Sequence, residues 1–208
     1  MDVVYGFHRH FYDLTRRFYL LGRNRLLKKI AVRPGDHVLE VGCGTARNLR
    51  LLARHRPDLH LYGLDASSLM LDTARTALRR RGLLQRIVLR QAAAEAWSPR
   101  ETFGLERPLD AIFFSYSLSM MPDWRAAIGR AVLHTRVGGS LHVLDFGDHA
   151  VWPRWMRAAH MNWLARFCVR PEPAMIEHLR ALQPKDGGLL VVESLLGGFA
   201  FLAQLTRG

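Results

Sequence analysis

The segment from residue 36 to residue 49, Asp-His-Val-Leu-Glu-Val-Gly-Cys-Gly-Thr-Ala-Arg-Asn-Leu, constrains the fold of this chain more than any other. An apolar strand ends in a turn from Glu40 to Gly44, and a helix is expected to follow at once. Two glycines let such a turn approach a ligand closely, and the turn would offer it free amides and the positive end of a helix. Asp65 ends the next strand, about 20 residues later, which is the spacing of a carboxylate that binds a ribose. Together these features predict a site for a nucleoside cofactor.

Apolar runs and helical patterns alternate along the rest of the chain and predict an α/β fold with a doubly wound, mostly parallel sheet. Strands are expected at 37–41, 60–64, 86–91, 111–114 and 140–146, and helices at 7–31, 45–55, 67–81, 123–135 and within 152–183. Gly138-Gly139 is expected to form a turn, and the final runs at 189–196 and 199–205, split by Gly197-Gly198, read as an antiparallel hairpin. We expect one domain over 1–208. It comprises an N-terminal helical lid or membrane segment (1–35) and a catalytic sheet (36–208) that carries a helical insertion (150–183).

Composition limits the possible partners. The chain has 208 residues, 49% of them hydrophobic, and a formal net charge of +12 that is almost entirely arginine, because lysine occurs only at 28, 29 and 185. Such a balance favours anionic partners, either nucleic acid or a membrane surface. The alternative is that a GC-rich genome encodes arginine in place of lysine, with no functional meaning. Cys43 and Cys168 are too few for a disulfide framework and lack metal-ligand spacing. No signal peptide or membrane span is expected.

Residues Val38 to Thr45 resemble the first motif of the class I S-adenosylmethionine-dependent methyltransferases, with Asp65 as the acid after the second strand. The C-terminal hairpin is similar to the end of their seven-stranded sheet. A closer resemblance is to the bacterial betaine-lipid N-methyltransferases. It rests on residues 12–16 with Gly22-Arg23, on 114–124, and on 143–147 followed by 153–155. Phosphatidylethanolamine N-methyltransferases and quinone C-methyltransferases share the general plan.

This resemblance implies successive methylation of the amine of diacylglycerylhomoserine to give the trimethylhomoserine lipid. S-adenosylmethionine would be the methyl donor, S-adenosylhomocysteine the product, and no metal would be required. The enzyme would work as a peripheral protein on the cytoplasmic face of the membrane. Its partners would be an anionic membrane surface, the lipid substrate and the preceding aminocarboxypropyl transferase of the pathway.

The resemblance also implies a set of cofactor contacts, which are Glu40, Gly42, Cys43, Gly44, Asn48, Asp65, Ala66, Met70, Ala94, Ser115 and Tyr19. Two positions depart from the family pattern. Ala93 stands where an acid usually reads the adenine amino group, so adenine recognition is expected from the Ala94 amide, or from Gln91 or Glu95. Ala46 stands where a third glycine is usual, and it fits if its φ is negative.

Candidate catalytic residues follow from the chemistry of methylating an amine. Tyr116, after the fourth strand, is the first candidate for contact with the acceptor amine, and Tyr12 or Tyr19 for the methionine carboxylate. His149, His8 and His10 are candidate proton acceptors. A quaternary ammonium product favours aromatic faces, and the candidates are Tyr5, Phe7, Tyr12, Tyr116 and Trp152. The carboxylate of a homoserine substrate should meet arginine, with Arg16, Arg17 and Arg154 as candidates. Ordinary packing is an equally open role for Tyr12 and Tyr19, and a lone histidine is more often structural than catalytic.

The region from His149 to Pro171 contains no acid, and its basic and aromatic residues alternate. The residues concerned are Arg154, Arg157, Arg166 and Arg170, with Trp152, Trp155, Met156, Trp163 and Phe167. Positions 152, 155, 156, 159, 163 and 167 would form one helical face, which suits the headgroup boundary of an anionic bilayer. Packing of this helix on the sheet is the alternative.

A lipid N-methyltransferase is therefore the leading hypothesis. A methyltransferase for a soluble or quinone-like acceptor is the second. An RNA-binding protein is the third, but neither an appended domain nor exposed stacking aromatics support it, so no nucleic-acid partner is expected.

Overall fold

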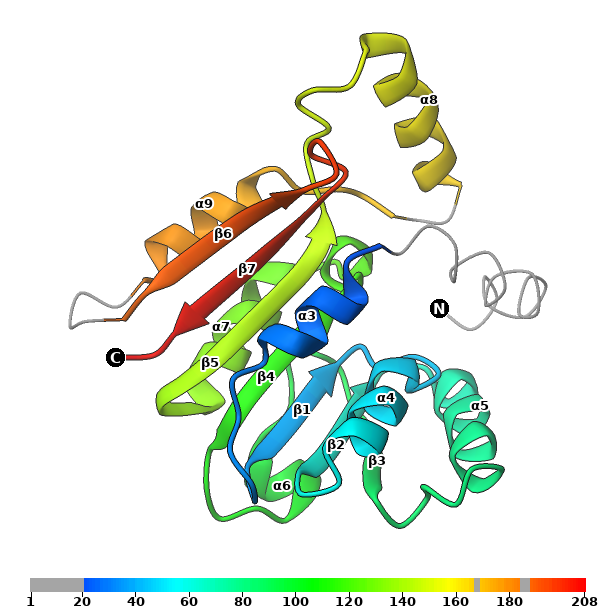
Figure 1. The fold of residues 1–208 in the computed structure, drawn as a ribbon, viewed down its shortest axis with the longest axis vertical. Helices are drawn as coiled ribbons and strands as arrows, with labels where there is room; N and C mark the ends of the chain where they lie inside the picture. The colour runs from blue at the N-terminus through cyan, green and yellow to red at the C-terminus, as the bar shows by residue number, and fades with distance from the viewer. Residues whose placement is uncertain (1–20, 167–168, 184–187) are drawn as a thin grey trace.

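The computed structural model describes residues 21–166, 169–183 and 188–208, and its centre is a seven-stranded sheet in the order β3-β2-β1-β4-β5-β7-β6 (Figure 1). The strands are β1 (His37–Val41), β2 (His60–Asp65), β3 (Ile87–Gln91), β4 (Leu109–Ser115), β5 (Thr135–Phe146), β6 (Leu190–Leu195) and β7 (Ala200–Thr206). The first five strands pair in parallel, and β7 lies antiparallel between β5 and β6. The predicted α/β fold with a closing antiparallel hairpin is confirmed.

Helices cover both faces of this sheet. They are α3 (Arg23–Lys29), α4 (Arg47–His55), α5 (Ser68–Arg79), α6 (Pro99–Phe103), the 3-10 helix η1 (Leu118–Met120), α7 (Trp124–His134), α8 (Arg154–Ala165) and α9 (Ala174–Ala181). In Figure 1, α3, α4 and α5 lie on one face and α7 and α9 on the other, while α8 stands apart beyond the end of β5.

The central strands are largely apolar because both faces of the sheet are buried there, whereas the edge strands β3 and β6 carry exposed polar residues. Side chains alternate along a strand, so Phe113 of β4 packs with Leu49 and Leu71 under α4 and α5. Its neighbour Phe114 packs with Ile128 of α7 on the opposite side. Every residue of β4 is buried, as expected of a central parallel strand.

Several boundaries differ from the sequence prediction. Strand β5 begins at Thr135, so Gly138-Gly139 lies within it and not in a turn. A Cβ at Gly139 would lie 2.7 Å from the Asp110 carbonyl oxygen, where the pairing of β4 and β5 shifts register, so glycine serves there as a bulge. Helix α6 was not predicted. The expected helical run 152–183 is two helices, separated by a segment that contains Pro171 and Pro173.

The predicted N-terminal helix falls mostly outside the described residues. Its described part is α3, which begins after Gly22 and ends at Lys29. Gly22 has a φ of +83°, which L-residues rarely adopt, and so a straight helix running through position 22 is excluded.

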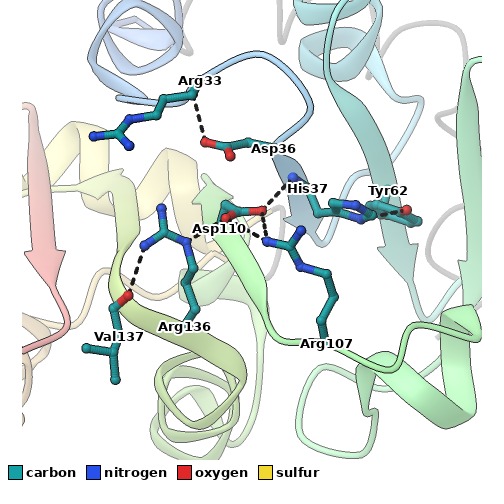
Figure 2. Close-up of polar contacts among 8 residues, drawn as sticks. All are labelled: Arg33, Asp36, His37, Tyr62, Arg107, Asp110, Arg136 and Val137. Atoms are coloured by element: carbon teal, nitrogen blue, oxygen red, sulfur yellow. Dashed lines mark hydrogen bonds and ion pairs between the residues drawn. The ribbon is translucent and has the colours of Figure 1, made fainter.

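A cluster of charged and aromatic side chains joins the starts of three parallel strands (Figure 2). Asp110 of β4 accepts hydrogen bonds from the His37 amide of β1 at 2.8 Å, from Arg107 at 3.0 Å and from Arg136 of β5 at 2.5 Å. The Tyr62 hydroxyl lies 3.0 Å from His37 Nδ1. Burial alone would raise the pKa of Asp110, but the amide and the two guanidinium groups hold that pKa below its usual value. This cluster fixes the amino end of the sheet, opposite to the end at which the glycine turn lies.

Candidate active site

A cavity of about 530 Å³ opens at the carboxyl ends of β1, β2 and β4. The glycine turn, α4, the start of α5, the segment after β3 and η1 line it. Ten of the eleven predicted cofactor residues belong to this lining, namely Glu40, Gly42, Cys43, Gly44, Asn48, Asp65, Ala66, Met70, Ala94 and Ser115. The eleventh, Tyr19, lies outside the described residues, as do Tyr5, Phe7, His8, His10, Tyr12, Arg16 and Arg17.

Asp65 joins the glycine turn to the start of α5. Its Oδ2 accepts a hydrogen bond from the Gly44 amide at 2.8 Å, and its Oδ1 accepts one from the Ser67 amide at 2.9 Å. Each carboxylate oxygen can accept a second hydrogen bond. The side chain therefore orders the loop at the edge of the cavity.

The backbone of the turn is used differently from the sequence prediction. The Gly42 and Cys43 amides both donate to the Leu64 carbonyl, at 2.7 and 3.0 Å, and the Gly44 amide is taken by Asp65. These three amides serve the fold, and the expectation that they are free for a ligand is wrong. Gly42 is required for another reason, because its φ is +72° and a Cβ there would lie 2.6 Å from Ser117 Cβ.

Ala46 also departs from its prediction. Its φ is +55°, where a negative value was expected, and it caps the N-terminus of α4 in the left-handed region. This conformation costs an L-residue roughly 1–2 kcal/mol, which explains why a glycine is usual at this position of the family motif.

Glu40 is 2% exposed and faces the cavity from the end of β1. Asn48 Nδ2 donates to its Oε1 at 2.7 Å, whereas Glu40 Oε2 has no hydrogen-bond partner among the described residues. Burial raises the pKa of Glu40 to about 8, although Asn48 and the nearby Arg23 oppose this rise. A carboxyl group in this state ionises readily when a cation enters the cavity beside it.

Tyr116 lines the cavity just after β4, with a φ of +54° and a buried ring. Its hydroxyl donates to the Leu21 carbonyl at 2.6 Å, and its ring lies 4.8 Å from that of Phe146. Burial raises the pKa of Tyr116 well above its usual range. The phenol therefore keeps its proton at neutral pH and offers the cavity a ring face. Its predicted contact with an acceptor amine stays a prediction.

His149 lies elsewhere, in a buried aromatic cluster at the base of α8. Its Nε2 is 2.9 Å from His160 Nδ1, and its ring packs against Trp152 and Phe199. Burial lowers the pKa of both histidines. His149 is not among the residues that line the cavity, so its position does not support the predicted role as proton acceptor there.

Several lining residues were missed from the sequence. Arg23, Met120, Met121 and Pro122 reach the cavity from segments that are remote in sequence from the glycine turn. They belong to segments that carry the betaine-lipid resemblance, 22–23 and 114–124, but no role at the cavity was predicted for them. Ala93, Ala94 and Glu95 line the cavity, and their predicted role in adenine recognition stays a prediction. Gln91, the other candidate, is absent from the lining and donates to the Ala66 carbonyl at 3.1 Å.

Helix α8 is mostly exposed, and Leu164 is its only buried residue. Trp155 is 73% exposed and Val151, just before the helix, is 74% exposed. The predicted apolar face is divided, because Trp152, Met156 and Trp163 are half-buried while Trp155 points into solvent. The Arg170 amide donates to the Ser119 carbonyl at 2.8 Å, which ties the segment after α8 to η1 at the cavity. Within the described ranges, no helix has both the length and the apolarity to cross a membrane.

Comparison with known proteins agrees with this geometry. Residues 38–139 match the family model of a methyltransferase domain. The trans-aconitate 2-methyltransferase of Azoarcus sp. is 28% identical over 76% of this chain and 60% of its own length. The demethylmenaquinone methyltransferase of Listeria welshimeri is 26% identical over 68% of this chain and 58% of its own length. This chain thus spans about 60% of the length of these relatives.

The fold agrees as well. The crystal structure of the S-adenosylmethionine-dependent methyltransferase SibL matches 97% of this chain and 59% of its own, with a TM-score of 0.70 and 22% identity. The matched segment holds β1 to the start of β5, with the glycine turn and Asp65. Residues 38–139 therefore match the model of a methyltransferase domain, and the chain shares the fold of a solved methyltransferase, which agrees with the resemblance of the first motif.

Proposed function

We propose that this protein transfers a methyl group from S-adenosylmethionine, bound in the cavity, to an acceptor that enters beside Tyr116 and Met120. One observation carries the proposal. A single cavity joins the glycine turn, the buried Glu40 and the ribose-type acid Asp65 at the carboxyl ends of adjacent parallel strands. Ligands of open α/β sheets bind at this edge.

The residues present fit this cofactor. Asp65 lies at the cavity on the end of β2, and a carboxylate with two oxygens suits two neighbouring ribose hydroxyls. Glu40 offers a buried oxygen without a partner among the described residues to the positively charged methionine end. Ala66, Met70 and Ala94 provide apolar wall for the adenine. When bound, the cofactor supplies a methyl group on a cationic sulfur.

The chain contributes positioning more than proton chemistry. In-line transfer requires the acceptor atom to be held about 3 Å from the methyl carbon. Ser115 Oγ at the end of β4 is buried in the cavity wall and has no partner among the described residues, so it can hydrogen-bond an acceptor. Tyr116 shapes the wall with its ring, and Met120 and Met121 cover it with apolar surface that excludes water.

For the acceptor, we propose the amine of a membrane lipid headgroup, with diacylglycerylhomoserine as the first candidate. The support is α8, where the exposed Trp155 lies beside Arg154 and Arg157 on a helix tied to η1. A tryptophan flanked by arginines suits the boundary of an anionic bilayer. The protein would then act as a peripheral protein at the cytoplasmic face of the membrane, next to the enzyme that makes its lipid substrate.

The relatives favour a second candidate. A methyltransferase for trans-aconitate and one for demethylmenaquinone are both similar to this chain, which supports a soluble carboxylic acid or a quinone as acceptor. Phosphatidylethanolamine would keep the lipid class and change only the headgroup.

Label transfer from methyl-labelled S-adenosylmethionine distinguishes these acceptors. Anionic vesicles would carry either diacylglycerylhomoserine or phosphatidylethanolamine, and trans-aconitate would be offered in solution. We expect label in mono-, di- and trimethyl species of the homoserine lipid. Label only in trans-aconitate would contradict the lipid acceptor and keep the methyltransferase activity. Label only in phosphatidylethanolamine would correct the headgroup.

A further inference from the structure

A row of arginines forms one wall of the cavity, beyond the residues assigned to the cofactor. Arg47, Arg50 and Arg54 are spaced by three and four residues on α4, so they share one face of the helix. Arg81, just after the end of α5, belongs to the same lining. Helices α4 and α5 both contact β2, and residues of both helices line the same cavity.

Three of these arginines have no acidic partner. Among the described residues, no carboxylate lies within ion-pair distance of Arg47, Arg54 or Arg81. Arg75 of α5 behaves differently and pairs with Asp72 at 2.8 Å. The cavity carboxyl of Asp65 is already engaged with the amides of the loop. No ion pair within the described ranges neutralises the positive charges of Arg47, Arg54 and Arg81, which leaves them for a ligand.

This arrangement is unfavourable for the protein alone. Arg47 is the first residue of α4, where the positive end of the helix dipole disfavours a cation, and the first turn carries no acid. Residues 47–90 contain ten arginines and only three acids. Arg54, in the last turn of α4, follows the dipole rule, so the conflict lies at Arg47 and in the excess of positive charge, and such a conflict is expected at a functional site.

We propose that the wall formed by Arg47, Arg54 and Arg81 binds a phosphate-bearing ligand with at least two negative charges. The guanidinium group is planar and binds phosphate through two parallel hydrogen bonds. Arg47 and Arg54 are separated by about 10 Å along α4, which is too far for one phosphate and suits two charged groups. The proposal goes beyond methyl transfer and is independent of the acceptor.

Calorimetric titration with inorganic pyrophosphate tests the site directly. We expect saturable binding to the wild-type protein and at least a tenfold loss of affinity in R54Q/R81Q. The matched control is R79Q/R80Q, which removes the same charge from exposed arginines of the α5 end that do not line the cavity. We expect its affinity to stay within a factor of two. Absence of saturable binding to the wild type, or an equal loss in both variants, would overturn the proposal.

Two further arms identify the source of the phosphate and keep this site distinct from the proposed function. Phosphatidylcholine vesicles containing phosphatidylglycerol are titrated with the same variants. If R54Q/R81Q binds the vesicles more weakly and R79Q/R80Q does not, the ligand is a phospholipid. If R54Q/R81Q binds only pyrophosphate more weakly, the ligand is a free phosphate compound. A separate titration of the wild type with S-adenosylmethionine tests the methyltransferase proposal. The protein can bind pyrophosphate without binding S-adenosylmethionine, or bind S-adenosylmethionine without binding pyrophosphate, so the two proposals fail independently.

Discussion

Glu40 carries a buried carboxyl group whose protonation is linked to folding. Burial raises its pKa from an ordinary value of 4.5 to about 8 in the folded protein. Between these two values the folded state holds a proton that the unfolded state has released. The stabilisation is therefore fully present below about pH 4.5 and is lost as the pH rises through about 8. A cation that binds beside Glu40 acts in the opposite direction, because it favours the ionised form.

We expect the Glu40→Gln substitution to flatten the pH dependence of stability. In the wild type, the Glu40 contribution lowers the free energy of unfolding between about pH 5 and pH 8, and glutamine has no proton to lose. Urea unfolding at several pH values over this range measures the slope. Glu106→Gln, at an exposed side chain, is the matched control and should keep the wild-type slope. Equal slopes in all three proteins would remove Glu40 from the linkage.

At the scale of single elements, α8 joins the cavity to the outside of the molecule. Its end is anchored by Leu164 in the core and by the hydrogen bond from the Arg170 amide to Ser119, beside the cavity residue Met120. The opposite side of the helix exposes Trp155 with Arg154 and Arg157. An element placed in this way can bring the cavity mouth to a bilayer.

Reversal of two charges on α8 should weaken membrane binding. Each arginine near an anionic surface contributes about 1 kcal/mol. The Arg154→Glu/Arg157→Glu variant should therefore bind phosphatidylglycerol vesicles at least tenfold more weakly in sedimentation, and Trp155→Ala should weaken binding as well. Arg79→Glu/Arg80→Glu changes the net charge equally at the end of α5 and is the control. Unaltered partition of the α8 variants would contradict a membrane role for this helix.

The elements also show what the sequence can predict. The buried strands could be predicted because burial on both faces makes them continuous apolar runs. The glycine turn and Asp65 could be predicted because each lies in a short contiguous segment. The early start of β5 was missed, because Gly139 acts as a bulge opposite Asp110 and glycine pairs usually mark turns. Arg23 and Met121 meet only in the folded chain. That His149 lies outside the cavity lining depends on tertiary packing, which the sequence does not show, and its role as proton acceptor stays a prediction.

At the scale of the whole molecule, the two edges of the sheet have different roles. The carboxyl edge holds the cavity and leaves polar atoms such as Glu40 Oε2 without partners among the described residues. At the amino edge, the Asp110 carboxylate receives the His37 amide and two arginines, which joins β1, β4 and β5. Stability and ligand binding are therefore separable by mutation.

The Asp110→Asn substitution should lower the free energy of unfolding by on the order of 2 kcal/mol, because charge-assisted hydrogen bonds are lost at a buried position. The pKa of Asp110 is lowered in the folded protein, so its stabilisation is present above about pH 3.8, the ordinary pKa of the carboxyl group, and is lost as the pH falls through the lower pKa of the folded state. Urea unfolding measures both effects. Affinity for S-adenosylmethionine should not change, and a parallel loss of that affinity would contradict the separation of the two edges.

The most direct test of the central claim is calorimetric titration of S-adenosylmethionine into the wild type and the Asp65→Ala variant. Asp72→Ala, at an exposed acid of α5, is the control. We expect one saturable site, unchanged by Asp72→Ala and at least tenfold weaker in Asp65→Ala, because that change removes the acceptors for the ribose and the anchor of the Gly44 amide. A folded wild-type protein that does not bind S-adenosylmethionine, or equal affinity in Asp65→Ala, would contradict the assignment of this cavity.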